Sequence, residues 1–491
     1  MIDAGMPATN GGELERLKMA KNICIFSDGT GQMGGARPDQ RLSNVYKMYR
    51  AMRPGPDSPI SPKDQIAFYD PGLGTGEGGG LLGRIKPILE SAVGTGIDHN
   101  IIDCYEQIIA HYEPGDRVLL FGFSRGAYTV RALANVMNLC GIPTQMPDGK
   151  LIPRHGLGLR KIAEDAVKFV YNHGAGKPRG QNPYFRNREE LGRRFRHKYS
   201  SAPLEGDDNQ GNVQPTFIGV FDTVASLRTA VVRTLVWGIT GAVGAAFIAG
   251  MTLGWSLLLV IPLGVLLVAL GWQISSLLID NFKYFSDDPD HKLKLWRLSD
   301  WPQILKTGHF AAWSKRNYDM WLDPDVRHAR HAMAIDEDRA DFPRVGWASK
   351  NAAIETKDRE PKWLKQVWFS GCHSDIGGSY PEAESRLSDI ALDWMVDELN
   401  ECVPSIIVNE NFLNRAPDPL GLQHRENAMI AFGPLRIAWK KGVREVGDDF
   451  SLHPSVQERI QATSVAQCEE VKPYRPKQLS KRQELKCFYE E

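Results

Sequence analysis

The sequence has few cysteines and no excess of charge. Seven cysteines are scattered over 491 residues, and none of them lies in a C-x-x-C motif. An odd, scattered set of this kind argues against a disulfide framework or a zinc cage and favours a reducing compartment. Lysine and arginine together number 59, as do aspartate and glutamate, so the formal net charge is zero. Without a basic excess, we expect no general nucleic-acid-binding surface.

Two nucleotide-binding motifs are incomplete in this sequence. The glycine-rich run over residues 70–80 has no Gly-Lys-Ser/Thr ending, so it is not a P-loop. Gly29, Gly31 and Gly34 form a G-x-G-x-x-G pattern. A dinucleotide site needs a helix to open at such glycines, whereas the next helix signal starts only near Ser43. The pattern fits a tight turn better, either a plain turn or one that stabilises an oxyanion.

Charged residues are absent from Thr234 to Ile279. This run is too long for one membrane span and long enough for two helices of about 20 residues each, with a turn at 250–256. Basic residues flank the run and predict that both ends are cytoplasmic; they are Arg228, Arg233 and Lys283. We therefore predict a transmembrane helical hairpin over residues 229–282, in the bacterial inner membrane. The alternatives are a buried core hairpin and a hydrophobic lid.

The pentapeptide Gly122-Phe-Ser-Arg-Gly126 has the pattern G-x-S-x-G. The apolar run 118–121 before it predicts a buried strand, and apolar residues at helical spacing over 127–137 predict a helix after it. A strand, this turn and a helix together indicate a nucleophile elbow, which presents the hydroxyl of Ser124 above the sheet edge. The alternative is a plain turn in which Ser124 only caps the helix.

Other apolar runs predict strands that alternate with helices. A helix is expected over 97–112, and strands are expected over 23–26, 65–69, 216–221 and 365–371. This order is typical of an α/β protein with a mostly parallel sheet flanked by helices. In such sheets the functional groups lie at the carboxyl ends of the strands. Asp222 and His373 each follow a predicted strand, so we expect them to meet Ser124 there.

A serine nucleophile needs a base and a group that orients the base. Ser124, Asp222 and His373 follow the chain order Ser, Asp, His of the α/β-hydrolases, so we predict His373 as the base and Asp222 as its orienting residue. Asp222 could instead cap a helix. Asp375 is a competing orienting residue, and His453 is the alternative base.

An oxyanion hole is expected beside the serine. One N–H would come from the residue after the serine, Arg125, and the other from the loop after the first strand, with Asp28, Gly29 and Thr30 as candidates. No metal or other cofactor is expected. His328, His331 and Asp336 could be read as metal ligands, but an exposed helix of mixed charge fits that stretch better.

The chain divides into parts along these lines. We expect a flexible leader over 1–20, a hydrolase domain in two parts over 21–228 and 283–459, the hairpin over 229–282 between them, and a peripheral charged tail over 460–491. The basic cluster 193–198 fits a solvated face or a contact with anionic lipid.

An ordered set of motifs resembles a known family, the α/β-hydrolase domains of uncharacterised bacterial proteins typified by type VI secretion phospholipase effectors of the first lipase class. The motifs are Phe26-Ser-Asp-Gly-Thr-Gly, Tyr69-Asp-Pro-Gly-Leu-Gly-Thr-Gly, Gly122-Phe-Ser-Arg-Gly-Ala-Tyr, Phe221-Asp-Thr and His373-Ser-Asp-Ile-Gly-Gly. The resemblance implies an α/β-hydrolase fold, a lipolytic triad of Ser124, Asp222 and His373, and an immunity or secretion partner protein.

These observations together predict a membrane-anchored serine hydrolase that cleaves acyl esters of phospholipids or related lipids. The bilayer and its lipids would be its partners, and the catalytic domain would be cytoplasmic. Two other classes stay open: a non-catalytic membrane-anchored scaffold on a hydrolase fold, and a toxin that acts by inserting the hairpin into a membrane.

Overall fold

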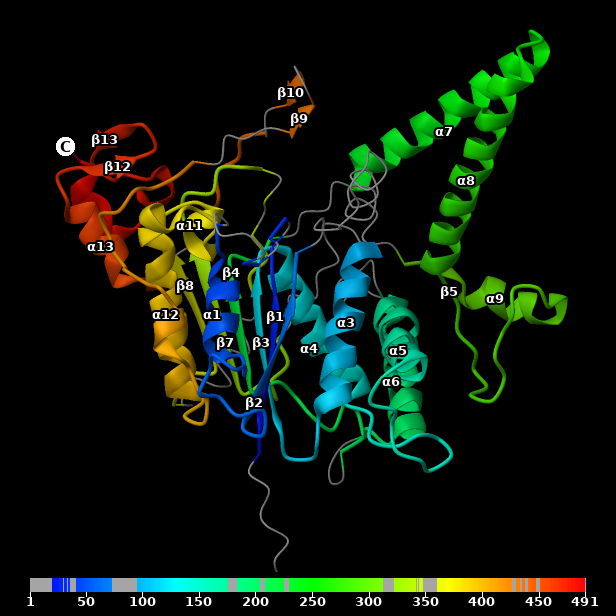
Figure 1. Cartoon of the computed structure of the whole chain (residues 1–491), viewed down its shortest axis with the longest axis horizontal. Helices are drawn as coiled ribbons and strands as arrows, with labels where there is room; N and C mark the ends of the chain where they lie inside the picture. Colours follow the sequence, from blue (N-terminus) through cyan, green and yellow to red (C-terminus); the bar gives the residue numbers. More distant parts are fainter. Residues whose placement is uncertain are drawn as a thin grey trace, which may run out of the picture.

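The centre of the protein is a seven-stranded, wholly parallel sheet with helices on both faces (Figure 1). The computed structural model describes residues 20–29, 31–32, 34–35, 41–72, 95–174, 183–203, 208–224, 229–311, 322–340, 342, 344–347, 360–425, 430–432, 435–437, 440–446 and 451–490. The sheet order is β11-β8-β7-β4-β3-β1-β2. The strands are β1 (Asn22–Ser27), β2 (Gln65–Asp70), β3 (Arg117–Phe123), β4 (Phe217–Phe221), β7 (His328–Ala334), β8 (Leu364–Phe369) and β11 (Ser451–Leu452).

Side chains of the central strands point alternately to the two faces of the sheet and pack into two separate hydrophobic cores. Ile23 and Ile25 of β1 point to the face covered by α3 (Thr95–His111) and α4 (Arg125–Cys140), with α5 (Leu157–Glu164) and α6 (Phe185–Tyr199) beyond them. Cys24 and Phe26 point to the other face, under α1 (Asn44–Met52) and α12 (Arg386–Cys402). Such continuous apolar strands are expected where both faces of a parallel sheet are covered.

The strand order reverses at β1, beside the end of β3. From β1 the chain crosses to β2 at the sheet edge and then returns to β3 on the other side of β1. Ligands of open α/β sheets bind at the carboxyl ends of strands next to such a reversal. The loops after β1 and β3 therefore meet at the position where a site is expected.

The structure confirms the strands that the sequence predicted, over 23–26, 65–69, 118–121, 216–221 and 365–371.

One stretch folds differently from its prediction. Residues 328–336 were expected as an exposed helix of mixed charge, but His328–Ala334 is the buried strand β7 between β4 and β8. The polar side chains are tolerated because distant residues satisfy them: Arg330 donates to Glu398 at 2.5 Å, and the His331 ring bonds the Thr223 N–H at 3.2 Å. Buried polar groups of this kind need partners, and here the partners are remote in sequence.

The C-terminal region is not a peripheral tail. It contains α13 (Pro454–Gln461), β12 (Val465–Gln467), β13 (Glu470–Lys472) and two short 3-10 helices, Lys477–Leu479 and Gln483–Phe488. Apolar residues of the predicted tail form a core with Trp368 of β8 and Met333 of β7; they are Ile460, Val465, Tyr474, Leu479 and Leu485. This burial holds the region against the sheet edge.

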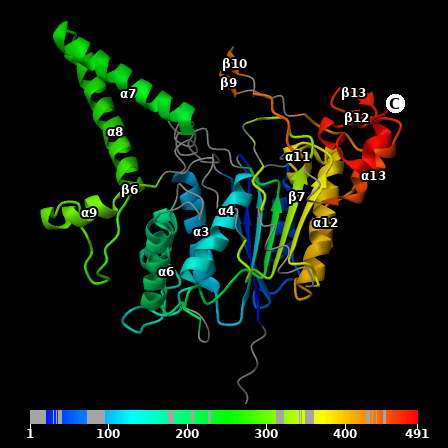
Figure 2. The ribbon, with the colours of Figure 1, turned by 180° about the vertical axis from the view of Figure 1, so that it is seen from behind.

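A long helical hairpin stands away from the sheet (Figures 1 and 2). It consists of α7 (Thr229–Thr252) and α8 (Leu257–Asn281), with the predicted turn between them. Within the described residues, α8 is the one helix long and apolar enough to cross a membrane by length and composition, whereas the apolar helix Trp237–Thr252 is shorter. Strand β5 (Phe282–Lys283) then pairs with β6 (His309–Phe310), and α9 (Trp301–Thr307) lies between them in sequence.

Candidate active site

Ser124 occupies a strained turn between β3 and α4. Its backbone φ is 58°, in the left-handed region that non-glycine residues rarely adopt. The flanking glycines permit the turn: a Cβ on Gly122 would lie 2.6 Å from the backbone of Ala127, and one on Gly126 would lie 2.0 Å from the carbonyl oxygen of Ser27. The pentapeptide therefore forms the predicted elbow, with Ser124 at the carboxyl end of β3.

Asp222 lies next to this elbow, at the carboxyl end of β4. The Ser124 N–H donates to the carbonyl oxygen of Phe221 at 3.1 Å, which fixes the two strand ends together. Asp222 also has a positive φ, 37°, and it is completely buried. Its carboxylate accepts a hydrogen bond from the Ala334 N–H at 3.0 Å and contacts His373 Nδ1 at 2.6 Å. The structure thus joins two of the predicted residues, Asp222 and His373, directly.

Arg444 is a partner of Asp222 that the sequence analysis missed. Its Nη1 and Nη2 donate to the two carboxylate oxygens at 2.6 and 2.9 Å. Burial alone would raise the pKa of Asp222, but the charge of Arg444 and the hydrogen bonds from His373 and Arg444 outweigh it and hold this pKa well below its usual value. Asp222 is therefore kept ionised. No motif surrounds Arg444, so no signal in the sequence pointed to it.

His373 is held between two aromatic rings. It opens the short helix α11 (His373–Gly377) after β8 and stacks on Phe123, with ring centroids 4.7 Å apart, while Phe342 meets it edge-on at 5.5 Å. The backbone N–H of His373 donates to Glu337 Oε2 at 3.2 Å. Its Nε2 is buried and has no hydrogen-bond partner among the described residues. Because Nδ1 faces Asp222, Nε2 is the ring nitrogen left for proton transfer.

No hydrogen bond joins His373 Nε2 to the Ser124 hydroxyl among the described residues, although both side chains are buried at neighbouring strand ends. Phe123 links them, because it precedes Ser124 in the chain and stacks on the His373 ring. Catalytic hydrogen bonds are often long before substrate binds and tighten in the complex. Phe123 thus places the Ser124 elbow next to His373, which is already paired with Asp222.

The predicted oxyanion loop also lies against the elbow. A Cβ on Gly29 would lie 3.2 Å from Ser124 Cβ, so the β1 loop and the serine are in contact. Arg125 opens α4, and the first N–H groups of a helix have no intrahelical acceptor. The Gly29 N–H, in contrast, donates to Asp28 Oδ1 at 2.7 Å. It is therefore engaged in this conformation, and the third candidate of the loop, Thr30, lies outside the described residues.

Asp28 acts as a structural centre of that loop. Its carboxylate accepts hydrogen bonds from Ser43 Oγ and from Tyr69 Oη, the latter at 2.8 Å. Burial raises its pKa to about 6, although these hydrogen bonds oppose the shift. The carboxylate therefore ties together the β1 loop, the N-terminus of α1 and the end of β2.

The two competing candidates belong to other pairs. His453 caps α13, bonds Ser455 through Nδ1 and stacks on Phe369, and burial lowers its pKa to about 4. Asp375 binds His424 Nδ1 at 2.7 Å and accepts the Cys372 N–H at 3.0 Å. Neither has a hydrogen bond to Asp222 or His373 among the described residues.

The possible metal ligands of the second half do not converge. His328 and His331 lie along the buried strand β7, and Asp336 follows that strand and accepts hydrogen bonds from Gly371 N and Tyr474 Oη. Burial lowers the pKa of His331 to about 3 and so keeps it neutral. Within the described residues, no group of three His, Cys, Asp or Glu side chains is arranged to hold a metal ion.

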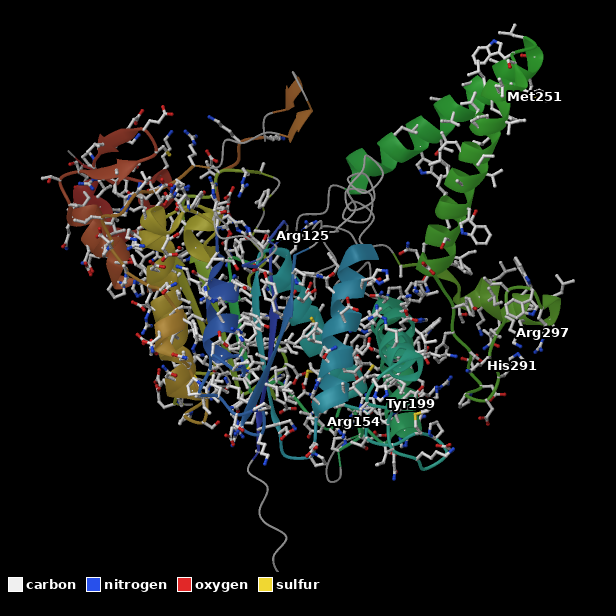
Figure 3. All side chains as sticks on the ribbon, in the orientation of Figure 1. Arg125, Arg154, Tyr199, Met251, His291 and Arg297 are labelled. Carbon is white, nitrogen blue, oxygen red and sulfur yellow. The ribbon has the colours of Figure 1, made fainter. Side chains whose placement is uncertain are left out.

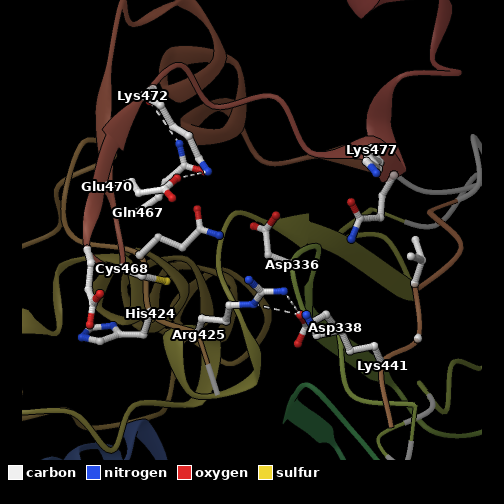
Figure 4. A pocket seen from close by; sticks show the side chains of 15 residues that line it. Asp336, Asp338, His424, Arg425, Lys441, Gln467, Cys468, Glu470, Lys472 and Lys477 are labelled. Atoms are coloured by element: carbon white, nitrogen blue, oxygen red, sulfur yellow. Dashed lines mark hydrogen bonds and ion pairs between the residues drawn. The ribbon is translucent and has the colours of Figure 1, made fainter. Parts of the chain in front are cut away.

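A polar cavity of about 930 Å³ lies between the end of β7 and the C-terminal region (Figure 4). Asp336 and Asp338 line it, whereas Glu337 between them accepts the His373 N–H, so one short segment separates the cavity from the site. Arg425 crosses the cavity wall to Asp338 at 2.7 Å. A lining of this charge suits water or a polar headgroup, and it does not suit an acyl chain.

Comparison with known proteins gives the chain a family. Residues 21–243 and 295–398, about two thirds of the chain, match the family described as "T6SS, Phospholipase effector Tle1-like, catalytic domain". The match contains Ser124, Asp222 and His373 but omits α8 and Arg444. A stretch of 130 residues is 31% identical to "Uncharacterized protein YEL023C" of Saccharomyces cerevisiae, which covers 25% of this chain and 18% of the yeast protein.

Two solved structures are also similar to the chain. An uncharacterized protein from Pseudomonas aeruginosa has 15% identity and a TM-score of 0.32, over 81% of this chain and 47% of that one. The Tle1 effector bound to the VgrG spike of the type 6 secretion system has 17% identity and a TM-score of 0.29, over 75% of this chain and 52% of that one. The chain therefore spans about half the length of these two proteins.

The sequence match to the family covers most of the chain and includes every strand end at which a predicted catalytic residue lies. The chain therefore belongs to the family of Tle1-like catalytic domains, which is named after a type VI secretion phospholipase effector.

Proposed function

We propose that this protein is a membrane-anchored serine hydrolase that cleaves acyl ester bonds of phospholipids through Ser124, His373 and Asp222. The observation that carries the proposal is the buried His373 ring beside the Ser124 elbow. Its Nδ1 lies 2.6 Å from Asp222 Oδ2, and its Nε2 has no partner in the described part of the chain. A base oriented on one nitrogen and open on the other is what an activated serine needs.

In the proposed reaction, Ser124 Oγ attacks the acyl carbonyl while His373 Nε2 takes the hydroxyl proton. Asp222 stabilises the imidazolium through Nδ1–H. The Arg125 N–H at the start of α4, together with a second donor from the β1 loop, stabilises the oxyanion. His373 then returns the proton to the leaving alcohol, and water hydrolyses the acyl-enzyme with His373 as the base again.

The chemistry is tested with phospholipid in mixed detergent micelles. Wild-type protein should release free fatty acid and lysophospholipid in equal amounts, and Ser124→Ala should release neither. Ser480→Ala, an exposed serine in the C-terminal region, is the matched control and should behave as wild type. Release of a phosphorylated headgroup instead of fatty acid would contradict acyl-ester cleavage.

The hairpin supports the anchoring half of the proposal. Large apolar side chains cover its exposed surface, including Leu258, Ile261, Val268 and Trp272. Monomeric soluble proteins rarely expose apolar area of this extent, whereas a bilayer would cover it. We propose that α7 and α8 insert in the bacterial inner membrane and that both halves of the catalytic domain stay on its cytoplasmic side.

Anchoring is tested by deleting residues 229–282. The shortened protein should leave the membrane fraction after carbonate extraction but keep its activity on mixed micelles. Loss of a biological effect on deletion but not in Ser124→Ala would favour the membrane-inserting toxin. Retention of the full effect in Ser124→Ala with the hairpin intact would favour the scaffold. We propose a resident enzyme rather than cargo for a spike such as VgrG, because the hairpin would hold it in the membrane of the cell that makes it.

A further inference from the structure

An apolar stripe faces outward on the segment after α8. Leu298, Trp301 and Leu305 follow helical spacing, and they are 84%, 40% and 71% exposed. Ile304 of α9 is buried and anchors this helix to the rest of the segment. Side chains three and four positions apart lie on one helix face, so these residues form a continuous outward-facing ridge. Nothing in the described part of the chain covers this ridge, and Trp296 beside it is also exposed.

Basic side chains surround the ridge. Lys294 lies over the Trp296 ring at 5.5 Å, and Arg297 and Lys306 are exposed. The acidic residue within this stretch, Asp300, is buried, and its carboxylate bonds His291 and the Lys294 N–H. Tryptophan, leucine and basic residues on one exposed face are the composition of a segment that lies in a membrane interface.

The acidic run 287–290 precedes the ridge in the chain and is exposed. Arg194 of α6 donates to the carbonyl oxygens of Ser286 and Asp287, at 2.8 and 3.1 Å, and Gln303 of α9 donates to the Asp287 carboxylate at 3.2 Å. The earlier candidate for lipid contact, the cluster 193–198, is largely used within the fold. Arg193 and Arg194 bind Glu190 at 2.8 Å, and Arg196 is buried against Leu139 and Asp208. The ridge is therefore the better candidate.

The ridge lies at the foot of the hairpin. α8 runs directly into β5, and the pairing of Phe282 with Phe310 ties both ends of the segment together there. In Figure 3, Met251 marks the tip of the hairpin, Arg297 lies near its foot, and Arg154 lies at the opposite edge of the body. Arg125, which follows the candidate nucleophile, lies at the edge from which the hairpin rises.

We propose that residues 294–306 form an interfacial binding surface for anionic phospholipid headgroups, with the ridge at the headgroup level. This inference rests on the proposed insertion of the hairpin. The surface would complete the docking of the protein on the bilayer. Helix α8 would fix how deeply the protein is inserted, and the ridge would fix the tilt of the catalytic domain relative to the membrane plane. The carboxyl edge of the sheet, with Ser124, then faces the bilayer that supplies the substrate.

The test uses the full-length protein in nanodiscs, with the exposed cysteines removed as Cys468→Ser and Cys487→Ser. The other free cysteines are buried. A fluorophore that reports polarity is attached in turn at Leu298→Cys, Met251→Cys and Leu157→Cys. Leu157 is the matched control, because it is 89% exposed and lies close in sequence to Arg154, at the opposite edge of the body. Nitroxide lipids labelled at the headgroup or in the acyl chain measure depth.

We expect the probe at Leu298 to shift its emission to the blue and to lose intensity with headgroup nitroxide. The effect should be larger with phosphatidylglycerol than with phosphatidylcholine alone. Replacing Lys294, Arg297 and Lys306 with glutamine should remove that lipid dependence, since each cation near an anionic surface contributes about a fivefold change in affinity. The probe at Met251 should lose intensity with acyl-chain nitroxide, and the probe at Leu157 should respond to neither nitroxide.

The outcomes separate the two proposals. If Met251 reports acyl depth while Leu298 behaves like Leu157, the interfacial surface is wrong and the anchor stands. If Met251 reports water, the anchor itself is wrong. The probe at Leu298 could also be shielded from water equally without lipid, with a shielding that rises with protein concentration. In that case a second copy of the chain covers the ridge, which also overturns the inference.

Discussion

Arg444 donates two hydrogen bonds to the carboxylate of Asp222, one to each oxygen, at 2.6 and 2.9 Å. The same guanidinium reaches the carbonyl oxygens of Ala334 and Phe342, at 3.2 and 3.1 Å. It therefore fixes the orienting carboxylate and also the loop whose Phe342 ring meets His373. Arg444 permanently offsets the negative charge of Asp222. It therefore weakens the attraction between that carboxylate and a protonated His373.

Arg444→Ala should weaken both activity and stability. We expect kcat/KM to fall about 10- to 100-fold, as for residues that orient a reacting group through another. Breaking a buried ion pair from one side costs about 3–5 kcal/mol of stability. The acid limb of the pH–rate profile should also move to higher pH, because Asp222 then acts on His373 without a competing cation.

Arg444→Lys is the control for this prediction, since it keeps the charge but not the two-point geometry. It should keep the acid limb close to that of wild type while losing part of the rate. A purely structural role for Arg444 would lower the melting temperature of both variants and leave the pH profile in place.

Substitution distinguishes between His373 and His453, the two candidates for the catalytic base. His373→Ala should lose activity by about 10³-fold or more, because it removes the proposed base. His453→Ala should keep kcat/KM near wild type and lose about 1 kcal/mol of stability, because His453 caps α13. His453→Ser, which preserves a cap, should restore that stability. The reverse pattern of activities would make His453 the base.

The elbow glycine Gly126 should not accept a side chain. A Cβ there would lie 2.0 Å from the carbonyl oxygen of Ser27, so Gly126→Ala must separate α4 from β1. We expect a loss of at least about 2 kcal/mol of stability, measured by denaturant unfolding. Gly158→Ala in α5 is the matched control, because its Cβ would meet the Pro153 side chain at 3.4 Å. It should gain about 0.5–1 kcal/mol, and equal losses in both variants would contradict the close approach.

Asp70 should give the fold a pH dependence. It is buried at the end of β2, and burial raises its pKa to about 7, although hydrogen bonds from Ser27 and Asn100 oppose the shift. The folded state then binds the proton more tightly than the unfolded chain, whose Asp pKa is about 3.9, so stability should fall as pH rises from about 4 to about 7. Asp70→Asn mimics the protonated form and should flatten this slope. An unchanged slope would mean that Asp70 stays ionised.

Local patterns predicted the parts of the site that depend on neighbours in sequence. The Ser124 elbow was readable because its strand, glycines and helix are contiguous, and the start of a helix near Ser43 was readable for the same reason. Strand β7 was misread because Arg330 and His331 are polar and yet buried. Their partners, Glu398 and Gln366, lie 68 and 35 residues away, so only the fold reveals that they are satisfied.

Arg444 was missed for a related reason. It lies 222 residues from Asp222, outside the part of the chain that matches the family, and no local pattern marks it. The C-terminal core was missed because its apolar residues are spread among charged ones. They bury only when they meet Trp368 and Met333 at the sheet edge.

The central claim is that Ser124 is an activated nucleophile, and the most direct test is labelling with a fluorophosphonate probe. Detergent-solubilised wild-type protein should become labelled at Ser124, Ser124→Ala should not, and His373→Ala should label far more slowly. Circular dichroism of each sample would establish that the proteins are folded. A folded wild-type protein that does not react, or a Ser124→Ala variant that still does, would contradict the proposed triad.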